Sequence, residues 1–146
     1  IWQTGRYYQE EALKHLKAYR GISVWCSDFI TRMDYAYSAA DLIISRAGAS
    51  SISELCLLKK PVILVPSPNV AEDHQTKNAL ALANKDAAIM VADKEAEQQL
   101  VPEALEVIHD DERLRTLSRN IEKLAQHQSA ERIVDEIVKI INKETL

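Results

Sequence analysis

The stretch R-A-G-A-S-S-I-S-E, at positions 46–54, has residue types that could hold a phosphate and a sugar. Gly48 allows the backbone to turn, or to approach a ligand closely, because it has no side chain. The amides that open the following helix, together with the helix dipole, would attract a phosphate, and the hydroxyls of Ser50 and Ser51 would add donors. Glu54 is spaced to share their helix face. In dinucleotide-binding folds an acidic residue binds ribose hydroxyls.

The same stretch has a second interpretation, as a helix cap. Residues 51–54, S-I-S-E, match the capping box S-x-x-E, in which the two polar side chains satisfy the first backbone amides of a helix. The sequence has no G-x-G-x-x-G motif, so a nicotinamide or flavin site is not supported. From the residues alone, the phosphate site and the capping box both stay open.

A second polar cluster, D-H-Q-T-K-N, lies at positions 73–78. Gln75 and Asn78, three residues apart, could hydrogen-bond the neutral hydroxyls of a sugar, or could simply belong to the solvated start of a helix. No Ser/His/Asp or Cys/His arrangement is spaced for nucleophilic catalysis, and no set of residues has metal-ligand spacing. We therefore expect no metal and no cofactor.

Strands and helices alternate along the chain and must position these clusters. Strands are expected at residues 1–4, 22–26, 41–45, 61–66 and 87–91. Helices are expected at residues 6–19, 31–40, 49–58 and 73–85, from Pro102 onward, and at 129–142. This alternation predicts an α/β fold, a doubly wound, Rossmann-like parallel sheet with helices on both faces. Both polar clusters follow strands, at the sheet edge where such folds bind ligands.

The composition is that of an ordinary soluble domain. The chain has 146 residues, 47% hydrophobic and 27% charged, which suits one domain with a substantial core. The net charge of −4, without a basic face, argues against nucleic-acid binding. No apolar run approaches the roughly 20 residues of a membrane span. Cys26 and Cys56 are expected to be reduced thiols, as in cytosolic proteins.

Residues 40–82, ADLIISRAGASSISELCLLKKPVILVPSPNVAEDHQTKNALAL, closely resemble the C-terminal domain of the MurG family. Its members are membrane-associated transferases that move N-acetylglucosamine from UDP-N-acetylglucosamine to lipid I, forming lipid II in peptidoglycan synthesis. The segments IWQTG, at 1–5, and DFITRM, at 28–33, fit this family too. The resemblance implies that residues 1–146 form the C-terminal, donor-binding domain of a two-domain GT-B glycosyltransferase of the family 28 type.

The resemblance also implies a role for individual positions in binding the nucleotide. Backbone groups around Phe29 and Ile30 would hold the uracil. Glu54 would accept both ribose hydroxyls. Ser50 and Ser51, with their helix N-terminus, would face the diphosphate. This assignment favours the nucleotide-sugar interpretation of the first cluster over the capping box.

The sugar end of the donor is assigned in the same way. Gln75, with His74 and Asn78 nearby, would contact the N-acetylglucosamine, and Thr4 and Gly5 would border the site. The mechanism implied is an inverting displacement that needs no metal. No catalytic residue is expected in this chain, because the resemblance places the base in an N-terminal domain.

The resemblance implies parts of the family pattern that this sequence does not contain. A Gly-rich G-G-S loop and a first strand would precede Ile1, as would a domain that binds the acceptor lipid I and docks on the cytoplasmic face of the plasma membrane. We therefore expect the chain alone to be inactive, and the sheet to be interrupted between the strands at 1–4 and 41–45. Two alternatives remain, a dolichol-linked or glycolipid N-acetylglucosaminyltransferase subunit and a non-catalytic UDP-sugar-binding module.

Overall fold

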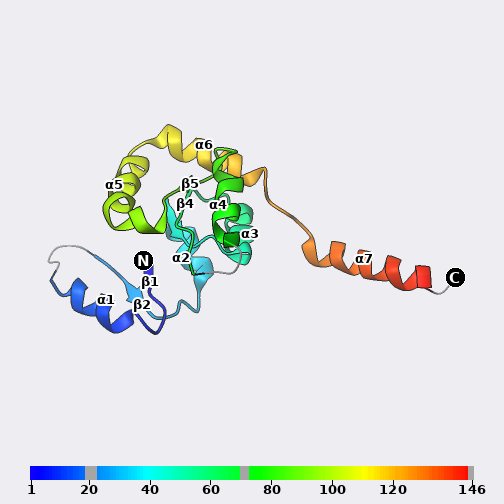
Figure 1. Ribbon diagram of the computed structural model, residues 1–146, viewed down its shortest axis with the longest axis horizontal. Helices are drawn as coiled ribbons and strands as arrows, with labels where there is room; N and C mark the ends of the chain where they lie inside the picture. Colours follow the sequence, from blue (N-terminus) through cyan, green and yellow to red (C-terminus); the bar gives the residue numbers. More distant parts are fainter. Residues whose placement is uncertain (19–22, 70–72, 145–146) are drawn as a thin grey trace. The chain divides into compact units, whose positions relative to one another are not determined.

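The computed structural model describes residues 1–18, 23–69 and 73–144, which fall into two compact units (Figure 1). The first unit is Ile1–Ala40 and the second is Asp41–Leu146. In the described residues each unit has its own parallel sheet, two-stranded in the first and three-stranded in the second.

The first unit is small and has little core. Its elements are β1 (Trp2–Gln3), α1 (Gln9–Leu16), β2 (Cys26–Ser27) and α2 (Met33–Ala39). β1 pairs in parallel with β2, with Trp2 opposite Cys26. Within its described residues only Ala12 and Ile30 are buried hydrophobics. This unit therefore gains little stability from burial of apolar surface.

The second unit contains most of the hydrophobic core. Its elements are β3 (Ile43–Ser45), α3 (Ala49–Leu58), β4 (Val62–Leu64), α4 (His74–Ala83), β5 (Ile89–Met90), the 3-10 helix η2 (Asp93–Glu95), α5 (Ala96–Ile108), α6 (Asp111–Glu122) and α7 (Ser129–Glu144). The parallel strands lie in the order β3-β4-β5. All three residues of β4 are 0% exposed. Because successive strand residues point to opposite faces, both faces of β4 are covered.

The predicted fold class is confirmed, since parallel strands alternate with helices through β5. No ladder joins β1 to β3 in the described part of the chain, which agrees with the expected interruption of the sheet between them. The strands are shorter than predicted. The strand expected at 22–26 is found at Cys26–Ser27, and its first position, like the end of the helix expected at 6–19, lies outside the described residues.

The prediction that a helix begins at Pro102 is wrong. Pro102 lies in the middle of α5, where it has no N–H to donate to the preceding turn. The helix continues through it because Leu100 and Ala104, on either side, pack against the core cluster of Ile63, Val65 and Val91. Burial of this apolar face outweighs the local cost of the proline.

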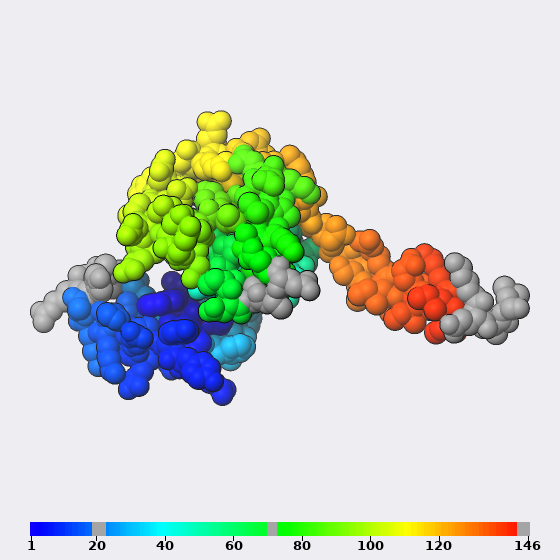
Figure 2. All heavy atoms as spheres, viewed as in Figure 1, coloured from blue at the N-terminus to red at the C-terminus, as the bar shows by residue number. Residues whose placement is uncertain are grey.

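The last helix, α7, exposes an apolar stripe. Every described side chain from 129 to 142 is exposed, and the space-filling view shows them uncovered, orange to red (Figure 2). The stripe contains large aliphatic residues, namely Ile133, Val134, Ile137, Val138, Ile140 and Ile141. The helical period predicted for residues 129–142 is confirmed, and the large aliphatic side chains of this helix are exposed.

Candidate functional site

The turn between β3 and α3, residues 46–48, is the centre of the candidate site. Ala47 is 0% exposed, which anchors the turn in the core. Gly48 has φ −69° and ψ 144°, a conformation open to any residue, so the turn itself does not require glycine. An added Cβ would meet only the Ser51 hydroxyl oxygen, at 3.7 Å. Gly48 was expected either to allow the backbone turn or to allow close approach of a ligand, and only the second role remains.

The amino end of α3 does not form the capping box. The helix begins at Ala49 with Gly48 as its N-cap, and no side chain caps it there. Ser51 is therefore the third residue of the helix rather than its cap, and Glu54 lies one turn further on. The first turn contains no acidic residue. Its backbone amides and the helix dipole favour an anion at this end.

Two amide side chains of α4 brace the turn. The Gln75 Oε1 atom accepts from the backbone N–H of Ala47 at 3.2 Å and from that of Ser67 at 2.9 Å. The Asn78 Nδ2 atom donates to the carbonyl of Ala47 at 3.1 Å. The sequence predicted sugar contacts for Gln75 and Asn78. The structure brings both beside the β3–α3 turn and shows that each also supports the backbone there.

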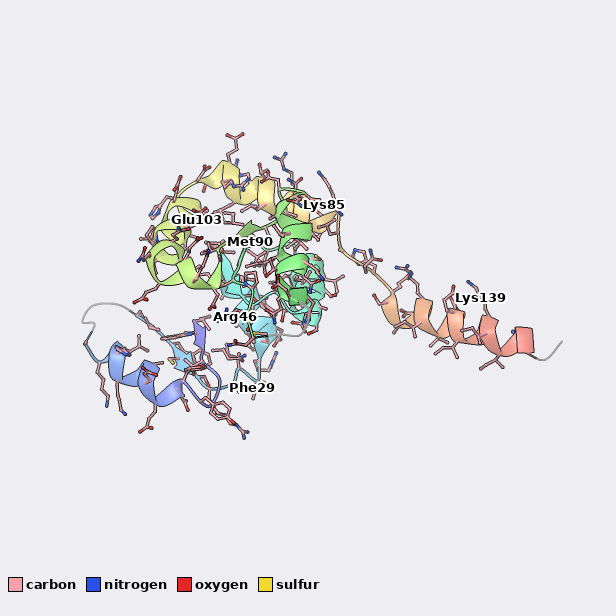
Figure 3. All side chains as sticks on the ribbon, viewed as in Figure 1. Phe29, Arg46, Lys85, Met90, Glu103 and Lys139 are labelled. Carbon is pink, nitrogen blue, oxygen red and sulfur yellow. The ribbon has the colours of Figure 1, made fainter. Side chains whose placement is uncertain are left out.

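Arg46 is part of this arrangement, although the sequence did not indicate it. Its Nη1 atom donates to the carbonyls of Val65, at 3.2 Å, and Pro66, at 3.4 Å, and forms an ion pair with Asp93 (Figure 3). These partners follow the carboxyl ends of β4 and β5, while Arg46 follows β3. The sequence feature that could have identified this pair is an arginine and an aspartate that each follow a strand of the same parallel sheet.

Ser50, Glu54 and His74 are exposed, and Ser51 is half-buried. Ser50, Ser51 and Glu54 lie on the first two turns of α3, and His74 opens α4. His15 and His109 are exposed, and the described residues include no group of three or more His, Cys, Asp or Glu placed to hold a metal.

The remaining predicted residues belong to the first unit. The Thr4 hydroxyl donates to the carbonyl of Ser27 at 3.2 Å. The Phe29 N–H donates to the carboxylate of Asp28 at 2.8 Å, and the Ile30 N–H donates to the Gln3 side chain at 2.8 Å. A nucleobase that accepts a hydrogen bond from either N–H must therefore displace the hydrogen bond that this N–H already makes.

Phe29 and Ile30 line a hollow of about 550 Å³ within the first unit. Its other lining residues are largely apolar or aromatic, among them Trp25 and Tyr35. Arg32 lies 3.9 Å from the centre of the Tyr35 ring. The bond from Arg32 to Asp34 holds the pKa of that carboxyl below its usual value.

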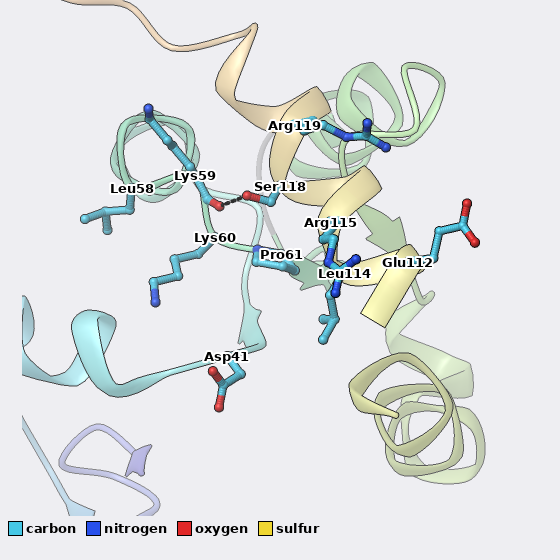
Figure 4. Close-up of a pocket in the computed structure, with 10 residues that line it drawn as sticks. All are labelled: Asp41, Leu58, Lys59, Lys60, Pro61, Glu112, Leu114, Arg115, Ser118 and Arg119. Carbon is cyan, nitrogen blue, oxygen red and sulfur yellow. Dashed lines mark hydrogen bonds between the residues drawn. The ribbon is translucent and has the colours of Figure 1, made fainter. Parts of the chain in front are cut away.

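A larger hollow, of about 810 Å³, lies in the second unit and contains none of the predicted site residues (Figure 4). It is bordered by the end of α3, the start of β4 and one side of α6. The Ser118 hydroxyl donates to the carbonyl of Lys59 across it, at 2.7 Å. Lys59 pairs with Glu122, and Arg115 pairs with Asp111. These acidic partners offset much of the positive charge around the hollow.

Comparison with known proteins defines the class to which this fold and site belong. Residues 1–137 match the glycosyltransferase family 28 C-terminal domain, and the chain belongs to that family.

Particular relatives narrow the class. The chain is 82% identical over 143 residues to a Parabacteroides distasonis protein named UDP-N-acetylglucosamine--N-acetylmuramyl-(pentapeptide) pyrophosphoryl-undecaprenol N-acetylglucosamine transferase, covering 98% of this chain and 39% of that protein. It is 58% identical to a Porphyromonas gingivalis protein of the same name, over 99% of this chain and 38% of that protein. The crystal structure of Acinetobacter baumannii MurG matches with a TM-score of 0.82 at 30% identity, over 94% of this chain and 42% of that one.

These matches confirm the resemblance seen in the sequence. The chain spans about 39% of the length of the first relative. The activity of the whole relative is therefore a proposal for this chain.

Proposed function

We propose that this chain is the donor-binding domain of an inverting glycosyltransferase that moves N-acetylglucosamine from UDP-N-acetylglucosamine to lipid I. The observation that carries the proposal is the uncapped amino end of α3, held at the carboxyl edge of a parallel sheet by Gln75 and Asn78. The names of the relatives support the choice of donor and acceptor. They also favour a peptidoglycan enzyme over a dolichol-linked enzyme or a non-catalytic module.

Each part of the donor has a partner in this proposal. The amides of α3, with Ser50 and Ser51, face the diphosphate, and the exposed Glu54 accepts from the ribose hydroxyls. His74, Gln75 and Asn78 bind the sugar. In the first unit, Thr4 borders the site, and Phe29 and Ile30 bind the uracil.

The chemistry assigned to this domain is stabilisation of the leaving group. As the bond between the anomeric carbon and the diphosphate breaks, negative charge grows on the phosphate oxygen. Preorganised amides and hydroxyls at the start of α3 stabilise that charge, because they need no reorientation as it develops. The base that takes the proton from the attacking 4-hydroxyl of the acceptor comes from another part of the enzyme.

The cellular setting is part of the same proposal. No helix within the described ranges is both long and apolar enough to cross a lipid bilayer. Lipid I is an acceptor held in a membrane, so the enzyme must work at a membrane surface. We place it peripherally on the cytoplasmic face of the plasma membrane, in peptidoglycan synthesis and thus in cell shape and division.

The test is a chimera in which this chain replaces the matching segment of the Parabacteroides distasonis relative. We expect the purified chimera to transfer radiolabelled N-acetylglucosamine from its UDP donor to a lipid I analogue. The parent enzyme is the positive control, and a chimera with Glu54→Gln tests the donor site. A folded chimera that transfers no sugar, beside an active parent, would contradict the proposed function.

A further inference from the structure

Arg46 connects the carboxyl ends of all three strands in the second unit. It follows β3 directly, its guanidinium donates to two carbonyls after β4, and it pairs with Asp93 in η2, after β5. All three contacts are made by Nη1, one nitrogen of the planar guanidinium, whereas a lysine ammonium is a point charge without that planar geometry.

The same short turn is held from its other side by α4. The N–H of Ala47, next to Arg46, donates to the Gln75 side chain, and its carbonyl accepts from the Asn78 side chain. Gly48, the next residue, is the N-cap of α3. The position of the α3 amino end relative to β4 and β5 therefore depends on Arg46 on one side and on α4 on the other.

This connection contributes more to geometry than to stability. The side chains of Arg46 and Asp93 are 56% and 35% exposed, and an ion pair that is this exposed adds little to the free energy of folding. Donor groups that bind a leaving diphosphate, by contrast, lose effect when they shift by about 1 Å. Loss of Arg46 should therefore affect donor use more than thermal stability.

We propose that Arg46 is a positioning residue for the donor site. It acts through the β3–α3 turn and keeps the amides of Ala49, Ser50 and Ser51 in place for the diphosphate. Asp93 serves as its anchor. The inference rests on the proposed function, because it assigns Arg46 to the same donor site.

The chain offers a matched control for this test. Arg113 also forms a surface ion pair with an aspartate, Asp86, at 2.6 Å, and it lies on α6 rather than on the β3–α3 turn. Arg46→Met and Arg113→Met each remove a guanidinium and one ion pair, and Arg46→Met also removes the bonds to the carbonyls of Val65 and Pro66. The melting temperature should fall by a small amount in both variants, and slightly more in Arg46→Met.

The experiment measures steady-state kinetics of these variants in the chimera, below the melting temperature of each. We expect Arg46→Met to raise the KM for UDP-N-acetylglucosamine about tenfold while the KM for the lipid I analogue stays unchanged. Arg46→Lys should recover only part of the loss, and Arg113→Met should behave as the parent chimera. Asp93→Asn, which keeps the shape but removes the charge, should raise the donor KM about threefold.

Each result separates the two proposals. An active chimera in which Arg46→Met keeps a donor KM within about twofold of the parent value overturns the inference and leaves the proposed function intact. If Arg46→Met does not fold, an unchanged donor KM in both Arg46→Lys and Asp93→Asn also overturns the inference about Arg46. A parent chimera that folds but transfers nothing contradicts the proposed function itself.

Discussion

Gln75 and Asn78 each use one group of the side-chain amide in bonding to the backbone, and we propose that the other group binds the sugar. The bonds to Ala47 and Ser67 use the oxygen of Gln75, so its amide nitrogen is the group that can donate to a sugar. In Asn78 the nitrogen is used, so its oxygen is the group that can accept. A sugar hydroxyl both accepts and donates, so one donor beside one acceptor suits it.

Glu54→Gln in the chimera should weaken binding of UDP-N-acetylglucosamine by about 1.5–3 kcal/mol, because hydrogen bonds to a charged acceptor are lost. The melting temperature should stay close to the parent value, since Glu54 is exposed and Ser51 is not the helix cap. Calorimetric titration measures the first quantity and thermal unfolding the second. Glu106→Gln, at an exposed glutamate of α5, is the control. Normal donor binding by the Glu54 variant would show that Glu54 does not contact the donor.

The two cysteines should differ in reactivity. Both are free thiols, but Cys26 is half-buried and Cys56 is buried, and burial raises the pKa of the Cys56 thiol above its ordinary value. The thiolate is the reactive form, so a thiol reagent at pH 8 should label Cys26 first. Mass spectrometry of each cysteine over time measures this. Labelling of Cys56 at the rate of Cys26 would contradict the buried position.

The raised pKa of Cys56 also sets a direction for stability against pH. The folded protein keeps this proton to a higher pH than the unfolded chain does. Its contribution to stability is therefore complete below the unfolded thiol pKa and is lost as pH rises through the folded value. Denaturant unfolding above pH 9 should show this decrease, and Cys56→Ala should remove it.

At the residue scale the sequence revealed which groups could bond but not their partners. Gln75 and Asn78 were recognised as hydrogen-bonding residues, and their support of Ala47 was not. Arg46 was missed because Asp93 lies 47 positions away along the chain. Which distant residues meet depends on strand order, and residue types alone do not report it.

At the scale of elements, α3 is shaped at both ends by backbone conformation. Its amino end is uncapped, and its carboxyl end closes with Lys59 in the left-handed region, at φ 57°. A residue with a Cβ is strained there, while glycine is not. The sequence predicted a helix at about these bounds but gave no sign of this strained position, because lysine is unusual at such an end.

Lys59→Gly should therefore be more stable than Lys59→Ala by about 1 kcal/mol. Both changes remove the ion pair with Glu122, so the difference isolates the backbone conformation. Urea denaturation of the two variants gives the comparison. Equal stability would mean that the turn relaxes out of the left-handed region once the lysine is removed.

Other elements show how far local patterns reach. The bounds expected for α3, about 49 to 58, agree with the structure, and so does the start of α7, which strong helical spacing marks. The helix that contains Pro102 was placed too late, since packing of Leu100 and Ala104 overrides the local preference of proline. Strand lengths were overestimated because an apolar run continues beyond the residues that form the ladder.

At the scale of the whole molecule, we propose that this chain supplies donor-side groups and that the base which activates the acceptor lies elsewhere in the enzyme. Histidine, the commonest such base, occurs in the candidate site only as His74, and we assign it to donor contact. Transfer requires an oriented acceptor hydroxyl and a base within about 3 Å of its proton.

The 146-residue chain should therefore show no transfer of N-acetylglucosamine on its own. The measurement is incubation with radiolabelled donor and a lipid I analogue, at the same concentration as the chimera. Turnover near the rate of the chimera would place the catalytic base within this sequence. It would also contradict the division of roles that we propose between the parts of the enzyme.

The complete burial of β4 has a consequence for the chain before it folds. Val62, Ile63, Leu64 and Val65 form an apolar run, β-branched at three of its four positions, of the kind that pairs with copies of itself when exposed, and unfolding exposes all of it. Pro61 and Pro66 flank the run and cannot donate to an intermolecular ladder. The two prolines thus limit aggregation of newly made chains at the segment on which the folded sheet most depends.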